Sequence, residues 1–313
     1  MLDSGDLSIV IPAFNEEGGV AQTLRTLKAS FPQAEIILVD DCSDDATLQE
    51  ARGVDGVRIV RHRFNRGYGA ALKTGMATAR GTFIAWFDAD GEHRVEDLAA
   101  MFHHLQERHL AAVVGRRPSV GQQPIRFFGK LILRIWARTL GVKVDRDLNC
   151  GLRVFHKEAI LPYLTMLPDK FSASTTSTMI MLERGYPIAF HDIRTNPRIG
   201  KSKVRLRHGF ETLLNILRTT MIFGPLRVYG SLGLGLATFS LAYGVIMALI
   251  IGRGFPGFAL AVLMAGLFLI AIGIIADQLS RWQLSAAAAH SLDLRRARQE
   301  RTAGKIADGN DQT

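Results

Sequence analysis

The chain has 313 residues, a formal net charge of +9 and two cysteines, Cys42 and Cys150. This length allows one large domain or two ordinary ones. Two cysteines exclude a disulfide scaffold and fit a reducing compartment. The positive charge indicates an anionic partner, which can be nucleic acid, a nucleotide or a membrane surface. The first apolar run, Leu7–Pro12, is too short for a signal peptide, so none is expected.

Strands and helices alternate from Leu7 to Gly115. Short apolar runs rich in branched and aromatic residues predict strands; they lie at Leu7–Pro12, Glu35–Val39, Val57–Arg61, Phe83–Phe87 and Ala111–Gly115. Helices are predicted between them, at about 19–30, after Ser43 or Asp44 as the capping residue, from a glycine-bearing segment at 65–75, and at about 95–108. This alternation predicts an α/β fold with a doubly wound, mainly parallel sheet.

Three of the predicted strands end in polar clusters. These are Phe14-Asn15-Glu16, Asp40-Asp41 and Asp88-Ala89-Asp90. Ligands bind outside the carboxyl ends of parallel strands, which meet at one edge of the sheet. Two carboxylates separated by one residue can hold a hard cation and leave positions free for phosphate oxygens. A surface turn is the alternative for Asp88–Asp90 alone, but three clusters in order favour a binding site.

The composition changes near residue 226. No charged residue occurs from Val228 to Gly252 or from Gly254 to Ala276, and each run is long enough to cross a bilayer as a helix. The segment between them holds Arg253, Gly254, Pro256 and Gly257, so a transmembrane hairpin at 226–280 is predicted rather than two buried core helices. Basic residues flank both ends. The positive-inside rule therefore predicts a multi-pass protein of the cell inner membrane, with both ends cytoplasmic.

Amphipathic segments adjoin the predicted hairpin. In Phe127–Leu140 the charges of Lys130, Arg134 and Arg138 recur at four-residue steps, as in an interfacial helix, and Gly209–Phe223 is similar. The predicted domains are thus a cytoplasmic catalytic domain at 1–205, a juxtamembrane amphipathic helix at 206–225, the hairpin, and a basic cytoplasmic tail at 281–313. The tail is predicted to contain a helix that can mediate homo-oligomerisation.

The ordered motifs resemble those of a known family. The segments Ser8–Glu17, Asp40–Asp45 and Asn65–Gly75 resemble the opening strand and loop, the second acidic motif and the glycine segment of inverting family 2 glycosyltransferases with the GT-A fold, whose sheet is Rossmann-like. Asp88-Ala89-Asp90 resembles their metal-binding Asp-x-Asp. Two later segments, Asp147–Phe155 and Arg198–Lys203, are similar to the polyprenyl-phosphate group. That group contains dolichyl-phosphate mannose synthase and bacterial undecaprenyl-phosphate sugar transferases. The resemblance extends over residues 7–280.

The resemblance implies inverting transfer of a sugar from a UDP- or GDP-linked nucleotide sugar to polyprenyl phosphate, expected to be undecaprenyl phosphate, for cell-envelope glycan or glycolipid synthesis. It implies Mg²⁺ or Mn²⁺ as cofactor. Asp90 is expected to ligate the metal directly, and Asp88 to ligate it or contact the donor ribose. Glu92 stands where relatives often carry Gln, and is expected near the metal or the acceptor. The membrane is an expected partner and nucleic acid is not.

Further residues are assigned to the donor and to the acceptor. Donor binding is expected from Pro12, Phe14, Glu16, Asp40 or Asp41, Lys73, Asp88, Ala89, Asp90 and Glu92. Glu16 can instead be a helix N-terminal acid, and Lys73 a solvated lysine. The acceptor phosphate is already an anion and needs no strong base, but it needs cationic guidance. That guidance is expected from Arg116, Arg117, Arg126, Arg198, Lys201, Ser202 and Lys203, with Asp88, Asp90, Arg117 and Arg126 as catalytic residues. Contact with lipid headgroups is the alternative for the 198–203 segment.

Some features depart from the family pattern. The 278–282 segment spells the Gln-x-x-Arg-Trp motif of processive polysaccharide synthases, but here Arg281 and Trp282 are interpreted as anchors at the membrane interface. Phe171–Ile180 is rich in hydroxyl groups where many relatives carry an acid, and His191-Asp192-Ile193 replaces a more usual Glu-Ile-Pro. Two alternatives therefore stay open. One is transfer to another membrane lipid or lipid-linked glycan, and the other is a non-catalytic nucleotide-sugar-binding membrane protein.

Overall fold

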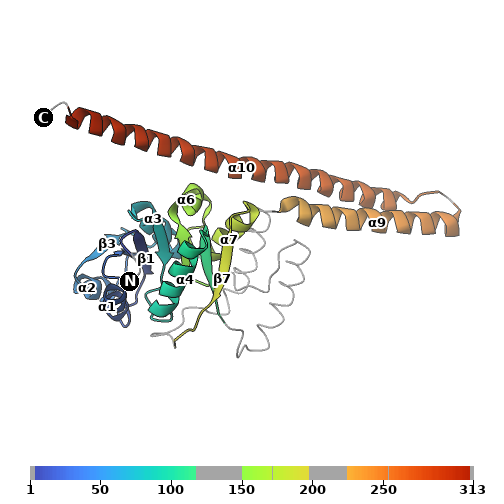
Figure 1. Cartoon of the computed structure of the whole chain (residues 1–313). Helices are drawn as coiled ribbons and strands as arrows, with labels where there is room; N and C mark the ends of the chain where they lie inside the picture. Colours follow the sequence, from blue (N-terminus) through green and yellow to red (C-terminus); the bar gives the residue numbers. More distant parts are fainter. Residues whose placement is uncertain (1–3, 118–149, 171, 197–223, 253, 311–313) are drawn as a thin grey trace. The chain divides into compact units, whose positions relative to one another are not determined.

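The computed structural model describes residues 4–117, 150–170, 172–196, 224–252 and 254–310 (Figure 1). The chain divides into two compact units, one built on a β-sheet and one on the two long apolar helices. The interfacial helices predicted at 127–140 and 209–223 lie outside the described residues, as do Arg126 and the 198–203 segment.

The sheet has seven strands in the order β3-β2-β1-β4-β6-β5-β7. Their bounds are β1 (Leu7–Ala13), β2 (Glu35–Asp40), β3 (Val57–Arg61), β4 (Phe83–Trp86), β5 (Ala112–Arg116), β6 (Arg153–His156) and β7 (Ile188–Asp192). Among these described strands only β6 runs antiparallel to its neighbours, β4 and β5, and every other pairing is parallel. The mainly parallel sheet is confirmed. The five predicted strands agree to within a residue or two, whereas β6 and β7 were not predicted.

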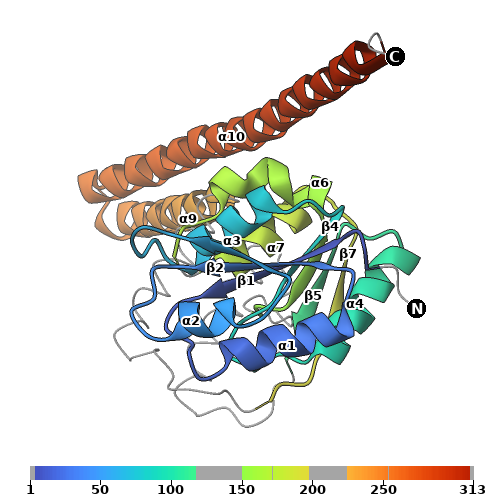
Figure 2. The same ribbon diagram turned by 90° about the vertical axis from the view of Figure 1, so that its left-hand side faces the viewer.

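Helices cover both faces of this sheet (Figure 2). They are α1 (Val20–Ser30), α2 (Thr47–Arg52), α3 (Tyr68–Thr78), α4 (Val95–Glu107), α6 (Lys157–Ile160), the 3-10 helix η1 (Leu161–Met166) and α7 (Ala173–Glu183). The helices α1, α2 and α4 lie on one face, and α3, α6 and α7 on the other. Both faces of the central strands are therefore covered, as expected for a doubly wound sheet.

Apolar periodicity explains how the helices dock on the sheet. In α1 the buried side chains include Leu24 and Leu27, and in α4 they include Leu98, Phe102 and Leu105, so each helix presents one apolar stripe. All seven residues of β1 are buried, as a central strand covered on both faces requires. Each fully buried Leu or Phe contributes about 1.5–3 kcal/mol relative to an exposed one.

The loop after β2 corrects one local prediction. Neither Ser43 nor Asp44 caps α2, because that helix begins only at Thr47. The Thr47 N–H instead donates to Asp45 Oδ1 at 2.9 Å. Ser43 Oγ accepts the N–H of Asn15 at 3.1 Å, and the Asp44 N–H donates to Asn15 Oδ1 at 3.0 Å. The loop that follows β2 is therefore fastened to the loop that follows β1.

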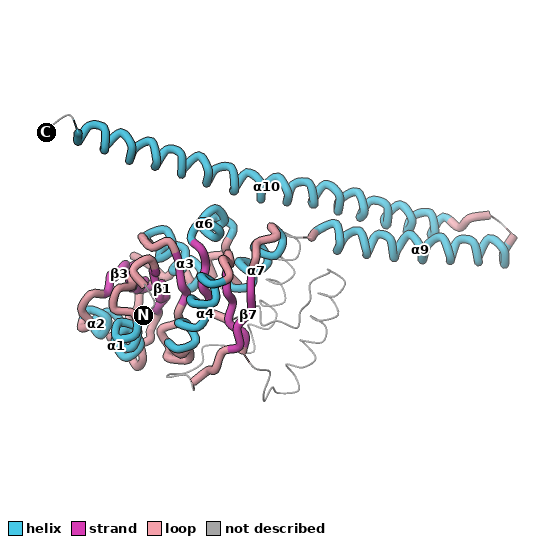
Figure 3. Tube along the Cα trace, viewed as in Figure 1, coloured by secondary structure: helices cyan, strands magenta, loops and turns pink. Residues whose placement is uncertain are grey.

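The second unit contains a pair of antiparallel helices, α9 (Pro225–Ile251) and the part of α10 (Gly257–Asn310) that extends to Ala286 (Figure 3). Their apolar parts, Pro225–Ile250 and Gly257–Gln283, have 26 and 27 residues, and each is long enough to cross a bilayer. The two backbones contact each other, because a Cβ added at Gly233 would lie 2.5 Å from Gly266 O. Small residues at such a contact are typical of membrane helices. Leu249 and Ile275 are 80% and 69% exposed in the chain, as side chains that face lipid would be.

The basic tail continues the second apolar helix, since α10 runs without a break to Asn310. No Gly or Pro occurs between Ala276 and Ala303, and the segment is rich in alanine and arginine, which favour a helix. A single helix therefore joins the membrane-length segment to the basic segment.

The start of β2 gives a testable property of the fold. Glu35 Oε2 accepts from Ser8 Oγ at 2.6 Å and from the Arg80 N–H at 2.7 Å, and Oε1 accepts from Arg58 Nη1 at 3.2 Å. Burial alone would raise the pKa of Glu35, but these hydrogen bonds outweigh it and hold the pKa below 4.5. The ionised carboxylate therefore stabilises the folded state above the unfolded-state pKa, and this contribution is lost as the pH falls through the lowered pKa.

We expect Glu35→Gln to lower the free energy of unfolding at pH 7 by about 1 kcal/mol, or Tm by about 2–4 °C. The difference from the wild type should shrink as the pH falls through the lowered pKa of Glu35, since the wild-type carboxyl is then protonated too. Thermal melting of the full chain in detergent at several pH values measures this. Glu50→Gln, at an exposed position of α2, is the control. A pH-independent difference would contradict the assignment.

Candidate active site

The three polar clusters lie at one edge of the sheet, which we call the carboxyl rim. The strands β1, β2 and β4 are parallel, and Ala13 pairs in register with Asp40 and Val10 with Trp86. Their following loops therefore leave the sheet on the same side. The loops also contact each other, since the Glu16 N–H donates to Thr47 Oγ1 at 2.7 Å. The structure thus brings together the clusters that the sequence predicted to meet.

Asp88 is held by two side-chain donors. Its Oδ1 accepts from the Tyr68 hydroxyl at 2.9 Å, and its Oδ2 lies 3.1 Å from His93 Nε2. Burial alone would raise the pKa of Asp88, but the hydrogen bond and charge of His93 and the Tyr68 hydrogen bond outweigh it, so the pKa lies below its ordinary value. Burial and the neighbouring carboxylate raise the pKa of Tyr68 well above 10. Asp88 is therefore an anion, and Tyr68 a neutral donor to it.

Asp90 and Glu92 complete the acidic loop after β4. Asp90 is buried, and its Oδ1 accepts the Glu92 N–H at 3.1 Å. Glu92 Oε1 lies 3.6 Å from Arg117 Nη1, so the predicted catalytic arginine at the end of β5 reaches this loop. The side chain of Ala89 is buried, and its carbonyl accepts from Thr23 Oγ1 at 3.2 Å, which fixes the loop to α1.

The donor set of this loop fits a hard divalent cation. Asp88 and Asp90 offer carboxylate oxygens, which Mg²⁺ and Mn²⁺ prefer to nitrogen or sulfur. Within the described residues, no group of three or more acidic, histidine or cysteine side chains is arranged around one point as a metal cage. One or two carboxylates are the usual protein contribution where Mg²⁺ is shared with substrate phosphates. The loop therefore offers two carboxylates to a divalent cation.

Asp40 and Asp41 build the loops of the rim. Asp40 is buried, with Oδ1 accepting the Ser43 N–H at 3.1 Å and Oδ2 lying 3.1 Å from Arg61 Nε. Asp41 Oδ1 lies 2.6 Å from His62 Nδ1, and its Oδ2 accepts the Gly67 N–H at 2.7 Å. These contacts give both carboxylates a structural task. Their predicted contact with the donor, like that of buried Pro12 and half-buried Phe14 and Glu16 on the neighbouring strand and loop, stays a prediction.

The glycine segment at the start of α3 contacts the loop at residues 167–170. The Gly69 N–H donates to Lys170 O at 3.2 Å, and the Ala70 N–H to Asp169 O at 2.8 Å. Gly67 has a φ of +101°, and a Cβ added there would lie 2.7 Å from Asp169 O. A residue other than glycine would therefore be strained at Gly67 and would also collide with the docked loop. We call this contact the 167–170 dock.

Lys73 belongs to the same dock. Its Nζ donates to Leu167 O at 3.1 Å and forms an ion pair with Asp169. The predicted contact of Lys73 with donor phosphates would compete with these two partners, and it stays a prediction.

The two arginines at the end of β5 have different partners. Arg116 pairs with Asp192 on the neighbouring strand β7, with Nη2 2.7 Å from Oδ2. This gives Asp192 a role in the segment that departs from the family pattern, because it neutralises an arginine in register with it. Arg117 contacts Glu92 instead. Of these two predicted acceptor residues, Arg117 thus contacts the acidic loop, whereas Arg116 is paired with Asp192 at the edge of the sheet.

Two residues of the Asp147–Phe155 segment, to which the sequence analysis gave no individual role, complete the site. A Cβ at Gly151 would overlap the Asp88 carboxylate, so only glycine fits there. Arg153 is fully buried at the start of β6. Its Nε donates to Cys150 O at 2.8 Å, and its Nη1 to Ser177 Oγ at 3.1 Å and Thr178 Oγ1 at 2.5 Å. The hydroxyl-rich α7 therefore serves a buried arginine, which in turn fixes the segment next to Asp88.

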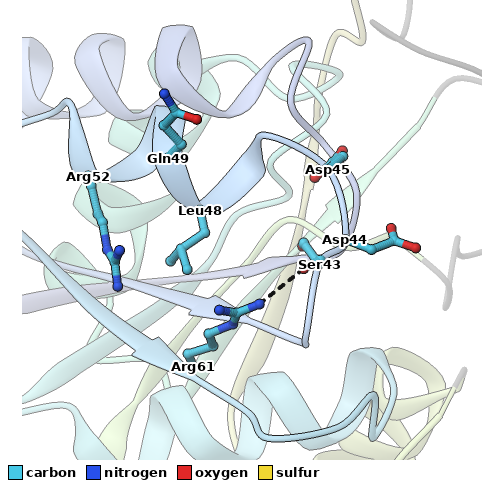
Figure 4. A pocket seen from close by; sticks show the side chains of 7 residues that line it. All are labelled: Ser43, Asp44, Asp45, Leu48, Gln49, Arg52 and Arg61. Atoms are coloured by element: carbon cyan, nitrogen blue, oxygen red, sulfur yellow. Dashed lines mark hydrogen bonds between the residues drawn. The ribbon is translucent and has the colours of Figure 1, made fainter.

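A surface cavity of about 610 Å³ lies beside the carboxyl rim (Figure 4). It is lined by Ser43, Asp44, Asp45, Leu48, Gln49, Arg52 and Arg61. This lining contains none of the predicted donor residues. Arg61 connects the two places, because it donates to Ser43 O at 3.2 Å while its Nε lies beside Asp40.

The fold is that of solved sugar-transferring enzymes. A structure of glucosyl-3-phosphoglycerate synthase from Mycobacterium tuberculosis with Mn²⁺, uridine diphosphate and phosphoglyceric acid matches with a TM-score of 0.53 at 18% identity, covering 67% of this chain and 77% of that one. A complex of the same enzyme with Mg²⁺ and uridine diphosphate matches with a TM-score of 0.53 at 19% identity, covering 67% and 78%. The sheet and the acidic loop thus define a GT-A glycosyltransferase fold.

The sequence comparisons identify the family. The protein-family model described as glycosyl transferase family 2 matches residues 8–158 of the chain. A second family model, described as the GtrB C-terminal hairpin, matches residues 224–282. Dodecaprenyl-phosphate galacturonate synthase of Rhizobium johnstonii is 31% identical over 319 residues, covering 90% of this chain and 89% of that protein. Undecaprenyl-phosphate 4-deoxy-4-formamido-L-arabinose transferase of Shewanella sediminis is 28% identical, covering 88% and 87%. The chain belongs to family 2 of the glycosyltransferases and contains a GtrB-type hairpin at residues 224–282.

Proposed function

We propose that this protein transfers a sugar, with inversion, from a nucleotide sugar to the phosphate of a polyprenyl lipid, with undecaprenyl phosphate as the acceptor. The observation that carries the proposal is the end-to-end match to dodecaprenyl-phosphate galacturonate synthase, which covers 90% of the chain and so includes both the catalytic sheet and the hairpin. A soluble acceptor would give no reason for two apolar helices of membrane length.

The acidic loop is proposed to hold Mg²⁺ or Mn²⁺ through Asp90, with Asp88 as a second ligand or as a contact to the donor ribose. When bound, such an ion acts as a Lewis acid that offsets the negative charge developing on a departing nucleoside diphosphate. The proposal is supported by the oxygen donor set and by the lowered pKa of Asp88, which keeps that carboxylate ionised at neutral pH. Glu92 lies in the same loop and orients Arg117.

In the proposed reaction an oxygen of the lipid phosphate attacks the anomeric carbon of the sugar, and the bond from that carbon to the diphosphate breaks. The nucleoside diphosphate leaves with the bonding pair. The nucleophile is already an anion, so the chain supplies positive charge rather than a strong base. Arg117 brings such a charge to the acidic loop through its contact with Glu92. Arg126, Arg198, Lys201, Ser202 and Lys203 are proposed to add to this guidance.

The nucleoside is proposed to bind along the ends of β1 and β2. Pro12, Phe14 and Glu16 supply an aromatic face and a carboxylate there, and Asp40 and Asp41 shape the adjoining loop. This arrangement suits a flat base and a ribose. The two glucosyl-3-phosphoglycerate synthase complexes of the same fold contain uridine diphosphate, which makes a UDP-sugar the first donor to test.

The sheet domain is proposed to lie at the cytoplasmic face of the inner membrane. Basic residues lie at both ends of the hairpin, with Arg227 near the start of α9 and Arg281 near the end of the apolar part of α10. Positive residues are retained on the cytoplasmic side. The lipid phosphate would then be presented at the same side as the nucleotide sugar.

The experiment is a donor and acceptor screen with the purified full chain in detergent. Panels of UDP- and GDP-sugars are combined with undecaprenyl phosphate and Mn²⁺ or Mg²⁺, and the glycolipid product is detected by mass spectrometry. We expect one donor class to give a sugar phosphate lipid and a stoichiometric amount of nucleoside diphosphate. Diacylglycerol in place of the phosphate lipid is the matched acceptor control. Product with diacylglycerol alone, or no product with any donor, would contradict the proposal.

A further inference from the structure

A continuous chain of contacts encloses the Asp88 carboxylate. On one side Tyr68, the first residue of α3, donates to Oδ1. On the other side the backbone at Gly151 lies so close that a Cβ would overlap the carboxylate. His93 Nε2 lies 3.1 Å from Oδ2. Asp88 is thus contacted from α3, from the segment before β6 and from its own loop.

The two outer contacts are themselves fixed by buried polar groups. The start of α3 is held by the 167–170 dock, where the Gly69 and Ala70 N–H groups donate to Lys170 O and Asp169 O. The segment at Gly151 is held by Arg153, which donates to Cys150 O and to the hydroxyls of α7. The dock directly precedes α7, so both supports meet in one stretch of chain. The dock therefore fixes the backbone from which the Tyr68 side chain extends to Asp88.

We propose that Tyr68 is a positioning residue, whose hydroxyl fixes the orientation in which Asp88 meets the divalent cation. This rests on the proposed metal-dependent transfer. A carboxylate oxygen can accept more than one hydrogen bond or ligand, so the Tyr68 and His93 contacts leave acceptor capacity on each oxygen. With both contacts in place the carboxylate plane is set. Without the Tyr68 hydroxyl, one oxygen loses its donor and the plane is free to rotate.

The Tyr68 hydroxyl donates directly to the carboxylate, with its oxygen 2.9 Å from Asp88 Oδ1. Partners that hydrogen-bond metal-ligating carboxylates commonly change metal affinity by about 10–100-fold when they are removed. Tyr68 comes from a different element than the acidic loop, which makes it a support for that loop rather than a part of it.

The test is Tyr68→Phe in the full chain, which removes one oxygen and keeps the ring. Binding of Mn²⁺ alone is followed by electron paramagnetic resonance of the free ion. We expect the dissociation constant of Mn²⁺ to rise about tenfold, and kcat to fall while the donor KM changes by less than about threefold. Tyr163→Phe is the matched control, because Tyr163 is a buried tyrosine whose ring packs on Tyr186 rather than on the acidic loop.

An Mn²⁺ affinity equal to that of the wild type overturns the assignment, whatever turnover does. A weakened affinity that comes with loss of the cooperative melting transition also overturns it, because Tyr68 would then support the fold alone. The Mn²⁺ measurement needs no substrate. A wild type that binds Mn²⁺ but transfers no sugar would therefore refute the proposed function, and the Mn²⁺ affinities of the wild type and Tyr68→Phe would still decide the role of Tyr68.

Discussion

Replacing Asp90 by asparagine should lower kcat by about a thousandfold, which corresponds to about 4 kcal/mol of transition-state stabilisation. Asparagine keeps the size of the side chain, and its carbonyl oxygen can still accept the Glu92 N–H that Asp90 Oδ1 accepts at 3.1 Å. The substitution thus removes the negative charge and little else. A neutral amide is a poor ligand for a hard cation compared with a carboxylate, so the charge on the leaving diphosphate would lose its main counterweight.

The measurement is initial-rate turnover at saturating donor over a range of Mn²⁺ concentrations. Asp55→Asn is the matched control, because Asp55 is an exposed aspartate in the turn before β3. It should keep wild-type turnover. If Asp90→Asn keeps more than about a tenth of the wild-type kcat, Asp90 does not hold a catalytic cation.

Replacing Gly151 by alanine is the second large change, with kcat/KM expected to fall about a hundredfold. The added Cβ would overlap the Asp88 carboxylate, so either that side chain or the backbone before β6 must shift. A shift of Asp88 stretches its contacts with Tyr68 and His93, at 2.9 and 3.1 Å. Displacement of a catalytic group by about 1 Å can cost about 100-fold in rate. The atoms that the added Cβ would overlap belong to the Asp88 carboxylate and not to the hydrophobic core, so the melting temperature should change little.

Gly53→Ala is the control for this substitution. A Cβ at Gly53 would have its nearest neighbour at 3.4 Å, an ordinary contact, and the backbone there has a φ of −75°. We expect it to melt and turn over like the wild type. Wild-type kcat/KM in Gly151→Ala would mean that the tight packing against Asp88 has no catalytic purpose.

Much of the carboxyl rim follows from sequence order alone. Parallel strands deliver the residues after them to one edge, so clusters at Asn15, Asp41 and Asp88 had to meet once the strands were recognised. The hairpin could also be predicted from the sequence, because a charge-free run of membrane length is rare in the helices of soluble proteins. In both cases a local pattern determines the structural outcome.

The partners of Asp88 could not be found in this way. Tyr68 lies 20 residues before it in the chain, within the glycine segment, and nothing in its neighbours shows which group its hydroxyl will meet. The glycines beside it signal a close approach of some backbone. Only the structure identifies the approaching segment as the 167–170 loop. The glycine pattern thus predicts that some backbone comes close, but it does not identify which segment that is.

Strand β6 was missed for a different reason. A buried arginine at its first position argues against a core strand, because an arginine is almost never fully buried unless its charge is compensated. Two of the hydrogen-bonding partners of Arg153 are hydroxyls of α7, 24 and 25 residues later. The sequence shows the hydroxyl-rich segment and the arginine separately, and only packing joins them.

The antiparallel direction of β6 bears on how this enzyme can diversify. Because β6 opposes β5, the chain leaves the sheet at Arg116 and re-enters it at Arg153 on the same edge, where Val114 pairs with Arg153 and the Gly115 N–H donates to Leu152 O at 3.0 Å. Both ends of the intervening stretch, which carries Arg126, are therefore anchored on neighbouring strands. Changes of sequence or length in that stretch leave the register of β5 and β6 intact as long as these two anchors hold.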